Sequence, residues 1–171
     1  SVGGALSHTE DGGAQVIDNT ITISDADDTQ LTQAIITISS GYTTGDVLIF
    51  TSPNTITEIS NSGGVLTIGG TASLTDYAAA LRSITYYSTS EDPTDNNNTN
   101  RTITWVVTDA DSDGAGAVNS SVASTTITIT PVNDIPAVTA GGSLAYTENG
   151  SSQVIDNTIT ISDADDTQLA Q

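Results

Sequence analysis

Much of the chain alternates between apolar and polar residues with a period of two. The clearest segments are residues 20–24, 102–107 and 125–130, in which isoleucine or tryptophan alternates with threonine. Because successive side chains of a strand point to opposite faces of a sheet, this pattern predicts strands with one buried and one solvated face. We therefore expect a sandwich of many short strands, with Trp105 in its core.

Other apolar segments predict further strands and the turns between them. The expected strands are residues 34–40, 46–50, 55–59, 65–68 and 83–88, and the expected turns are Gly41, residues 61–64 and Gly69-Gly70. Residues 73–82 have a helical period instead. Ser73 is placed to cap a helix with Asp76 at its third position, so we expect one short helix that crosses between the sheets.

The chain contains a long internal repeat. Residues 9–33 and 147–171 are identical at 21 of 25 positions and are offset by 138 residues. This offset predicts a tandem repeat of about 138 residues. Two prolines and an Asn-Asp pair in residues 130–136 indicate the join. We therefore expect a complete repeat in residues 1–136 and the N-terminal part of the next, truncated repeat in residues 137–171.

The chain is strongly acidic and has no cysteine. It carries 21 Asp and Glu against two Arg, for a formal net charge of −19. Such a charge repels phosphate groups and anionic lipids, so we expect no nucleic-acid partner and no membrane insertion. Without cysteine no disulfide can stabilise the fold, and a bound metal ion is the alternative.

The aspartates cluster at the ends of expected strands. Asp25, Asp27 and Asp28 follow residues 20–24, and the same cluster recurs in residues 163–166. Carboxylates this close repel one another, and a divalent cation removes the repulsion. Calcium takes oxygen ligands in irregular geometry, whereas zinc prefers His or Cys. The cluster therefore predicts bound Ca²⁺.

A second acidic cluster lies in residues 109–114, which have the Asp-x-Asp-x-Asp-Gly spacing of an EF-hand loop. Ser120 stands where such a loop needs a glutamate, and the flanks have the pattern of strands, so an EF-hand is not expected. Two alternatives are left: an Asp-rich hairpin that binds calcium, or a solvated acidic turn. Glu10 and Glu148, near the start of each copy, could likewise be ligands or ordinary surface residues.

Together these motifs resemble the bacterial cadherin-like tandem repeats of large calcium-dependent surface adhesins of the RTX type. The similar motifs are Thr-Glu-Asp at 9–11, Ser-Asp-Ala-Asp at 24–27, Val-Thr-Asp-Ala-Asp at 107–111 and Pro-Val-Asn-Asp-Ile-Pro at 131–136. The resemblance covers the whole repeat and its truncated successor. It implies an all-β Greek-key sandwich, cadherin-like or immunoglobulin-like, on a secreted or cell-surface protein.

The resemblance also implies where calcium binds, because such chains hold it at the junction between successive domains. The implied ligands of the join within this chain are Glu10, Asn133, Asp134, Asp163 and Asp165. By the same likeness, Asp25, Asp27 and Asp109 would serve the join with a preceding repeat. The Asp-Arg-Glu motif of animal cadherins has no clear match, so this ligand set is incomplete.

From these observations we expect a calcium-stiffened structural repeat of a large extracellular adhesin or surface filament protein. Its partners would be neighbouring repeats, and the near-identical copies suggest strand exchange between chains or filament assembly. The alternative is a calcium-dependent carbohydrate-binding module that binds a glycan, with Tyr42 as a candidate exposed aromatic. An enzyme is not expected: His8 is the only histidine, and its counterpart in the second copy is Tyr146.

Overall fold

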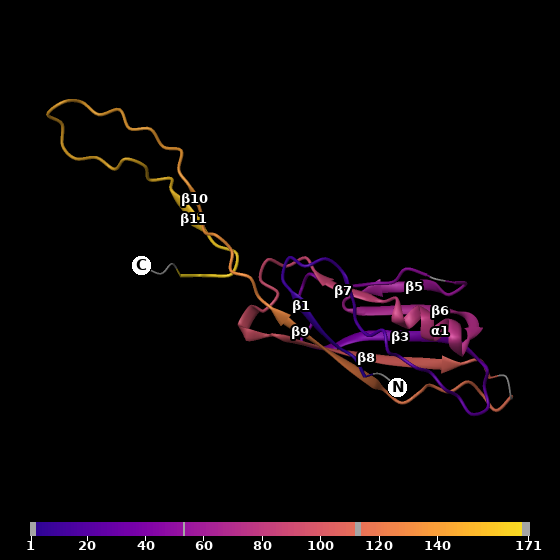
Figure 1. Cartoon of the computed structure of the whole chain (residues 1–171). Helices are drawn as coiled ribbons and strands as arrows, with labels where there is room; N and C mark the ends of the chain where they lie inside the picture. The colour runs from indigo at the N-terminus through magenta and orange to yellow at the C-terminus, as the bar shows by residue number, and fades with distance from the viewer. Residues whose placement is uncertain (1–2, 53, 112–113, 169–171) are drawn as a thin grey trace. The chain divides into compact units, whose positions relative to one another are not determined.

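The computed structural model describes residues 3–52, 54–111 and 114–168 of the chain. The chain divides into two compact units, Ser1–Val132 and Asn133–Gln171. In chain order the elements are β1 (Ala5–Thr9), β2 (Gln15–Val16), β3 (Gln30–Ser40), β4 (Asp46–Ile49), β5 (Thr57–Ser62), β6 (Val65–Ser73), α1 (Leu74–Arg82), β7 (Thr85–Ser88), the 3₁₀ turn η1 (Asp95–Asn97), β8 (Asn100–Asp109), β9 (Ala123–Thr130), β10 (Ala137–Thr139) and β11 (Thr160–Ser162) (Figure 1).

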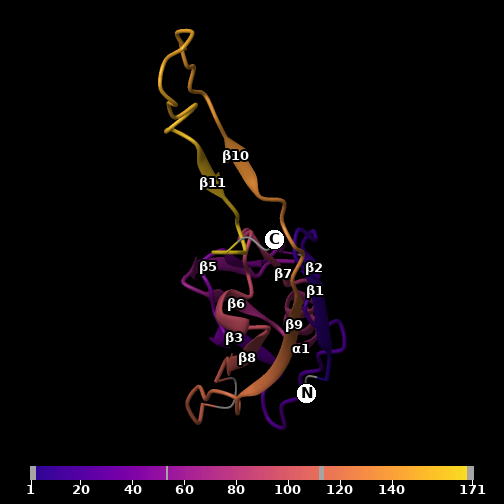
Figure 2. The ribbon, with the colours of Figure 1, turned by 90° about the vertical axis from the view of Figure 1, so that its left-hand side faces the viewer.

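The first unit is mostly β-structure. One sheet has six strands in the order β1-β9-β8-β3-β6-β5, and the other has three in the order β2-β7-β4. Figure 2 shows β8, β3, β6 and β5 following one another across the larger sheet. The strand pairs are antiparallel except for β1 and β9, which run parallel. This arrangement agrees with the all-β, sandwich-like fold expected from the alternating pattern.

Alternation places the core residues as expected. In β9, Ile127 and Ile129 are buried while Thr126, Thr128 and Thr130, which alternate with them, are exposed. In β8, Ile103 and Trp105 point into the same core. The indole N–H of Trp105 donates to the Thr125 hydroxyl at 3.1 Å, so the one polar atom of this ring is satisfied inside the protein. The prediction that Trp105 is a core residue is confirmed.

The short helix is also confirmed. Ser73 caps α1: its hydroxyl accepts the Asp76 N–H at 3.1 Å and donates to the Asp76 carboxylate at 2.7 Å. These two bonds satisfy a backbone donor that the first turn of a helix would otherwise leave unpaired. Tyr77 and Leu81 lie buried on the inner face. The helix connects β6 of the larger sheet to β7 of the smaller one, which is the crossing that the sequence predicts.

The prediction of a strand at residues 20–24 is wrong for the first copy. These residues belong to no strand, although Ile21 is buried and its carbonyl accepts the Arg82 Nε–H at 2.7 Å. In the second unit the counterparts of residues 22–24 form β11, which pairs with β10. Alternation shows which side chains turn inward, but a strand also needs a neighbour to pair with.

The predicted turn at Gly69-Gly70 is a bulge within β6. Between Ala72 and Gly69 this strand has one residue more than β3 has between Leu31 and Gln33, and the register shifts there. Gly70 takes a φ of +130°, which a residue with a side chain rarely adopts. Two adjacent glycines therefore bend the strand without ending it, and a pattern of glycines does not distinguish the two outcomes.

A buried ion pair lies in the core of the first unit. Arg101 and Asp46 are joined at 2.7 Å, and both side chains are fully buried. The guanidinium also donates to the carbonyl groups of Asn98 and Pro93, while the Tyr86 hydroxyl donates to Asp46 at 2.6 Å. Burial, then the bond to Asp46, raises the pKa of Tyr86, so this phenol stays a donor at neutral pH.

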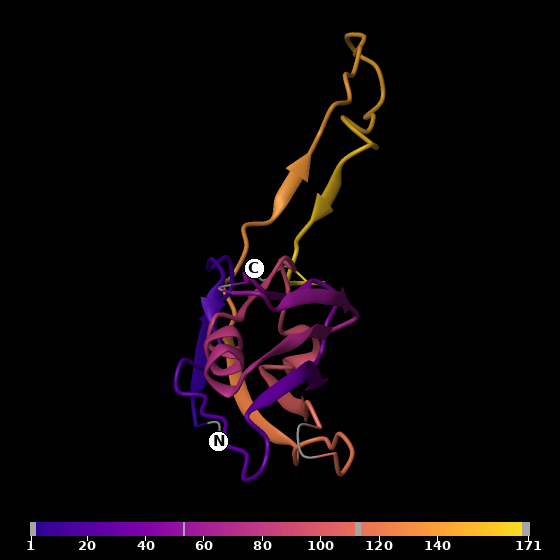
Figure 3. The ribbon, with the colours of Figure 1, turned by 90° about the vertical axis from the view of Figure 1, so that its right-hand side faces the viewer.

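The second unit contains one pair of strands. β10 and β11 run antiparallel (Figure 3). Val138 lies opposite Ile161 in this pair. The chain between them forms no further strand among the described residues. Most of the large apolar side chains of this unit are exposed to solvent.

Candidate metal-binding sites

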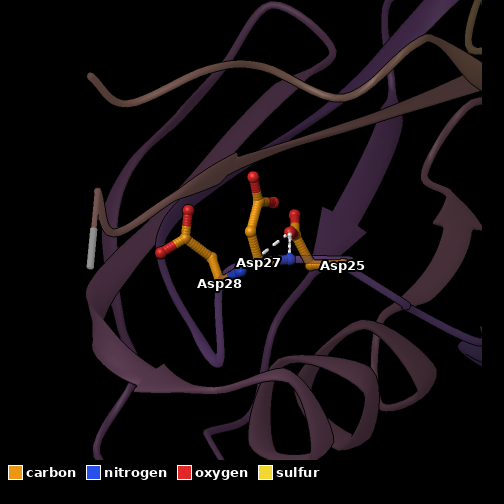
Figure 4. Close-up of side chains that lie close together, drawn as sticks. All are labelled: Asp25, Asp27 and Asp28. Carbon is orange, nitrogen blue, oxygen red and sulfur yellow. Dashed lines mark hydrogen bonds between the residues drawn. The ribbon is translucent and has the colours of Figure 1, made fainter. Parts of the chain in front are cut away.

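A tight turn gathers three carboxylates in the first unit. The Asp25 carboxylate accepts the backbone N–H groups of Asp27 at 3.2 Å and Asp28 at 3.0 Å. Aspartate favours such turns because its short side chain reaches the backbone two and three residues on. The turn brings carboxylate oxygens of Asp25, Asp27 and Asp28 within 4.8 Å of one another, with the side chains on one side of the loop (Figure 4).

The turn also favours the charged state of its first residue. The N–H of Asp28, then that of Asp27, lowers the pKa of Asp25, so this carboxylate is ionised at neutral pH. Asp25 and Asp27 are exposed, whereas Asp28 is buried. Asp28 belongs to the cluster for which the sequence predicts calcium, but the resemblance to adhesin repeats did not imply it as a ligand. Its position directly after Asp27 was a signal for including it.

Asp109 lies beside the aspartate turn of residues 25–28. It is the last residue of β8 and pairs with Leu31 at the start of β3, which directly follows the aspartate turn. Asp109 and the three turn aspartates line one open pocket of about 320 Å³. The structure therefore brings the predicted ligands Asp25, Asp27 and Asp109 together with Asp28. Carboxylate oxygens of Asp25, Asp27 and Asp28 lie close enough to share one ion, whereas Asp109 lines the same pocket outside this group. Oxygen ligands without His or Cys suit a hard cation such as calcium.

Asp109 also organises its own hairpin. Both oxygens of its carboxylate accept the Val118 N–H, at 3.0 and 2.9 Å, and the Asp111 N–H lies 3.3 Å from one of them. Ser112 and Asp113 of this acidic cluster lie outside the described residues. The described residues agree with both alternatives, a calcium-binding hairpin and a solvated acidic turn. The hydrogen bonds to Val118 alone are enough to hold the Asp109 carboxylate in place.

The second unit repeats the aspartate turn. Asp163 accepts the N–H groups of Asp165 at 3.2 Å and Asp166 at 3.0 Å. Asp165 in turn accepts the Asp134 N–H at 2.9 Å, and the Asn133 amide donates to the Asp134 carbonyl. The structure thus groups four predicted ligands of the join, Asn133, Asp134, Asp163 and Asp165, within one unit.

One carboxylate oxygen in the aspartate turn of the second unit is buried, and no described residue donates a hydrogen bond to it. Asp165 Oδ1 is buried and has no hydrogen-bond partner within the part of the chain that the structure describes. Leaving a charged oxygen buried without a partner costs free energy, and a bound cation would offset that cost. Asp165 is therefore a candidate ligand, but among the described residues only Asp25, Asp27 and Asp28 bring three acidic ligand atoms within 4.8 Å of one another.

Glu10, the remaining predicted ligand, belongs to the first unit. It is 5% exposed, which excludes the alternative of an ordinary surface glutamate. Its Oε2 accepts the Val132 N–H at 2.7 Å, and its own N–H donates to the Thr130 carbonyl at 3.0 Å. Glu10 therefore fixes the end of β9 and the residue that precedes Asn133. Glu148, its counterpart, is exposed.

Other acidic residues have internal hydrogen-bond partners. The Asp18 carboxylate accepts the N–H groups of Gly3 and Gly4, and both the N–H and the hydroxyl of Thr20. Asp156 makes the same four bonds in the second unit, to Gly141, Gly142 and Thr158. No pattern in the sequence separates these structural aspartates from candidate metal ligands.

These hydrogen bonds make the stability of the first unit depend on pH. Burial opposes the ionisation of Asp18, but the bonds from Thr20, Gly4 and Gly3 outweigh it and lower the pKa of this carboxyl. A lowered pKa in the folded state stabilises the protein above the unfolded value, about 3.9, and this contribution disappears as the pH falls below it.

We expect Asp18→Asn to lower the free energy of unfolding by about 1–3 kcal/mol at pH 7, and by less at pH 3. Urea denaturation of both proteins at the two pH values measures this difference. Asp11→Asn, at an exposed position, is the control. If Asp18→Asn lowered the free energy of unfolding by as much at pH 3 as at pH 7, the ionised Asp18 carboxylate would not be the source of the stability.

The features proposed for sugar binding or catalysis lie elsewhere. Tyr42 is 43% exposed and lies just beyond the C-terminal end of β3. Leu31, which lines the aspartate pocket, lies at the N-terminal end of the same strand. At about 3.3 Å per residue these two ends are roughly 30 Å apart. A glycan stacked on Tyr42 would therefore not reach a calcium ion in that pocket. His8 is buried edge-on against Tyr86, with ring centroids 5.1 Å apart. The absence of catalysis stays a prediction.

Comparisons of the chain with protein families, with curated proteins and with solved structures find no match. The class that the fold and the site define is therefore a mostly β protein whose two units each carry a turn of three aspartates. Among the described residues, no helix has the length and apolar character needed to cross a membrane.

Proposed function

We propose that this chain is a calcium-stiffened structural repeat of a large extracellular adhesin or surface filament protein, with a cadherin-like Greek-key sandwich. The observation that carries the proposal is the recurrence of one aspartate turn in both units, each time with other predicted ligands beside it. In the first unit this neighbour is Asp109, and in the second it is Asp134.

Each unit holds a different part of the ligand set expected at a join between repeats. Because Asp25 and Asp163 hold equivalent positions in the repeat, a complete join would combine Asn133 and Asp134, the aspartate turn that follows them, and a counterpart of Asp109. Neither unit contains this full set within the described residues. The combined set gives calcium enough carboxylates and carbonyls for its usual coordination.

Calcium would act on the stiffness of the join. Without it, the clustered carboxylates repel one another and the connection between repeats bends freely. With it, the bound ions would neutralise these carboxylates and hold them together. Glu10 already holds Val132, the residue before Asn133, so ions bound at Asn133 and Asp134 would be close in the chain to a point fixed on the first sandwich. Extracellular sites of this kind have dissociation constants of about 0.1–1 mM.

The experiment compares the whole chain in several millimolar CaCl₂ and in excess EDTA. We expect each filled site to add about 1–3 kcal/mol to stability, raising the melting temperature by about 2–4 °C per kcal/mol. In small-angle X-ray scattering, calcium should also narrow the distribution of distances within the molecule. Magnesium at the same concentration is the control for ionic strength. Melting curves that coincide in calcium and in EDTA would refute the proposal.

A further inference from the structure

Two strands from opposite ends of the first unit run side by side in the same direction. β1 and β9 pair in parallel, from Ala5 opposite Thr126 to Thr9 opposite Thr130 (Figure 2). β1 lies at the edge of the larger sheet, so β9 is its one partner strand among the described residues, whereas β9 also pairs with β8. The first and the last strand of this unit are therefore joined directly to each other.

The repeat shows how tension would enter and leave such a unit. β9 leads into the join at residues 130–136, and residues 143–147, which are equivalent to β1, follow that join. In a tandem array, each repeat would therefore be pulled at the start of its first strand and at the end of its last one. Because the two strands are parallel, these two points lie at opposite ends of the pair. Tension then slides one strand along the other.

We propose a further function for the first unit: β1 and β9 form a load-bearing pair that resists unfolding when an array of repeats is under tension. The inference rests on the proposed function, since a structural repeat within an array is pulled along the chain in this way. Sliding two parallel strands breaks their evenly spaced hydrogen bonds together, whereas peeling them apart from one end breaks the bonds one after another. Sliding therefore has the higher barrier, and the barrier governs forced unfolding.

Hydrogen bonds fasten both ends of the load-bearing pair. At the start of β1, the Asp18 carboxylate accepts the backbone N–H groups of residues 3 and 4 at 3.1 and 2.9 Å. Just after β1, the Glu10 N–H donates to the Thr130 carbonyl at 3.0 Å, and Glu10 Oε2 accepts the Val132 N–H at 2.7 Å. These bonds lie where tension would be applied, so they take up load together with the strands.

Packing on the inner side of β1 also opposes sliding. Leu6 packs against the core, and His8 is fully buried with its ring edge-on to Tyr86 of β7. A shift of one residue in register would turn these side chains to the other face of the sheet. The strand therefore cannot move along β9 in small steps, and the pair must break as a whole.

The test pulls single molecules of the full chain in two directions with optical tweezers. The natural chain has no cysteine, so pairs of introduced cysteines define the points of attachment. Gly3→Cys with Val132→Cys places the handles at opposite ends of the load-bearing pair, so that the strands slide. Asp11→Cys with Val132→Cys places both handles at the same end, so that the strands peel apart. We expect a several-fold higher rupture force for the first variant, and an equal or lower force would overturn the inference.

The three positions are suited to these changes. Gly3 and Asp11 are exposed, and Val132 is 40% exposed. A side chain at Gly3 would meet Thr20 Oγ1 at an ordinary contact distance of 3.9 Å. Urea denaturation should give the two variants similar free energies of unfolding, so a difference in rupture force reports the direction of load. Rupture in the first variant should release about 400 Å of chain, which identifies the event as unfolding of the first unit.

Pulling in several millimolar CaCl₂ and in excess EDTA separates this inference from calcium stiffening. None of the predicted calcium ligands lies within β1 or β9, so the difference between the two directions should persist in EDTA. If this difference persisted while melting curves coincided in calcium and in EDTA, the load-bearing pair would stand and the calcium proposal would fail. A difference that disappeared in EDTA would overturn the load-bearing pair.

Discussion

Replacing Arg101 by methionine is expected to lower the free energy of unfolding by about 3–5 kcal/mol. Methionine keeps most of the side-chain volume but removes the charge, so the loss comes mainly from electrostatics and not from a cavity. The Asp46 carboxylate would remain fully buried without the guanidinium that now binds both of its oxygens, at 2.7 and 3.3 Å. The carbonyl groups of Asn98 and Pro93 would also lose a donor. Urea denaturation monitored by tryptophan fluorescence measures the change.

The double variant Arg101→Met/Asp46→Leu separates the ion pair from the rest of the network. Removing both charges leaves no uncompensated ion in the core, so the double variant should be more stable than the sum of the single changes predicts. The Tyr86 hydroxyl would still lose its acceptor, so the double variant should remain less stable than the natural protein. Strict additivity of the two changes would show that Arg101 and Asp46 do not stabilise the fold as a pair.

The elements that the sequence predicted well depend on local patterns. Strand β9 alternates isoleucine with threonine because one face lies against the core, and Ser73 with Asp76 forms its capping bonds within a single turn. Both patterns act over a few residues and can be read without knowing the partner. The error at residues 20–24 has the same origin, since whether a strand has a neighbour depends on chain that is distant in sequence.

The buried ion pair was missed although the sequence contained a signal for it. Arg101 alternates in phase with Ile103 and Trp105, so the same pattern that placed the tryptophan in the core also placed one of the two arginines there. A buried arginine needs an acidic partner. Which of the 21 acids it takes could not be predicted, because Asp46 is 55 residues away in the chain.

The candidate site was predicted in part. The aspartate turn follows from the spacing of Asp25, Asp27 and Asp28, because an aspartate side chain binds the backbone two and three residues later. The proximity of Asp109 depends on the pairing of β8 with β3, and the sequence suggested it only through the resemblance to adhesin repeats. Composition also overstated the need for cations, since Asp18, Asp46 and Asp156 are held by hydrogen bonds inside the protein.

Under the proposed function, Asp27→Asn should weaken calcium binding to the first unit by about 10- to 100-fold. A charge-assisted contact contributes about 1.5–3 kcal/mol, and 1.4 kcal/mol corresponds to a factor of ten in affinity. Asparagine keeps the size of the side chain and one oxygen, so the change removes charge with little effect on shape. Isothermal titration calorimetry with CaCl₂ measures the affinity of the full chain.

Asp11→Asn is the matched control, because it removes the same charge from an exposed position where the second copy already has Asn149. If net charge alone attracted calcium, both variants would weaken binding equally, since each changes the total by one unit. A selective loss in Asp27→Asn would instead place the ion in the pocket that Asp27 shares with Asp109. The same variant should then lose part of the calcium-dependent rise in melting temperature, because a ligand that binds only the folded state stabilises it by an amount that grows with the logarithm of its affinity.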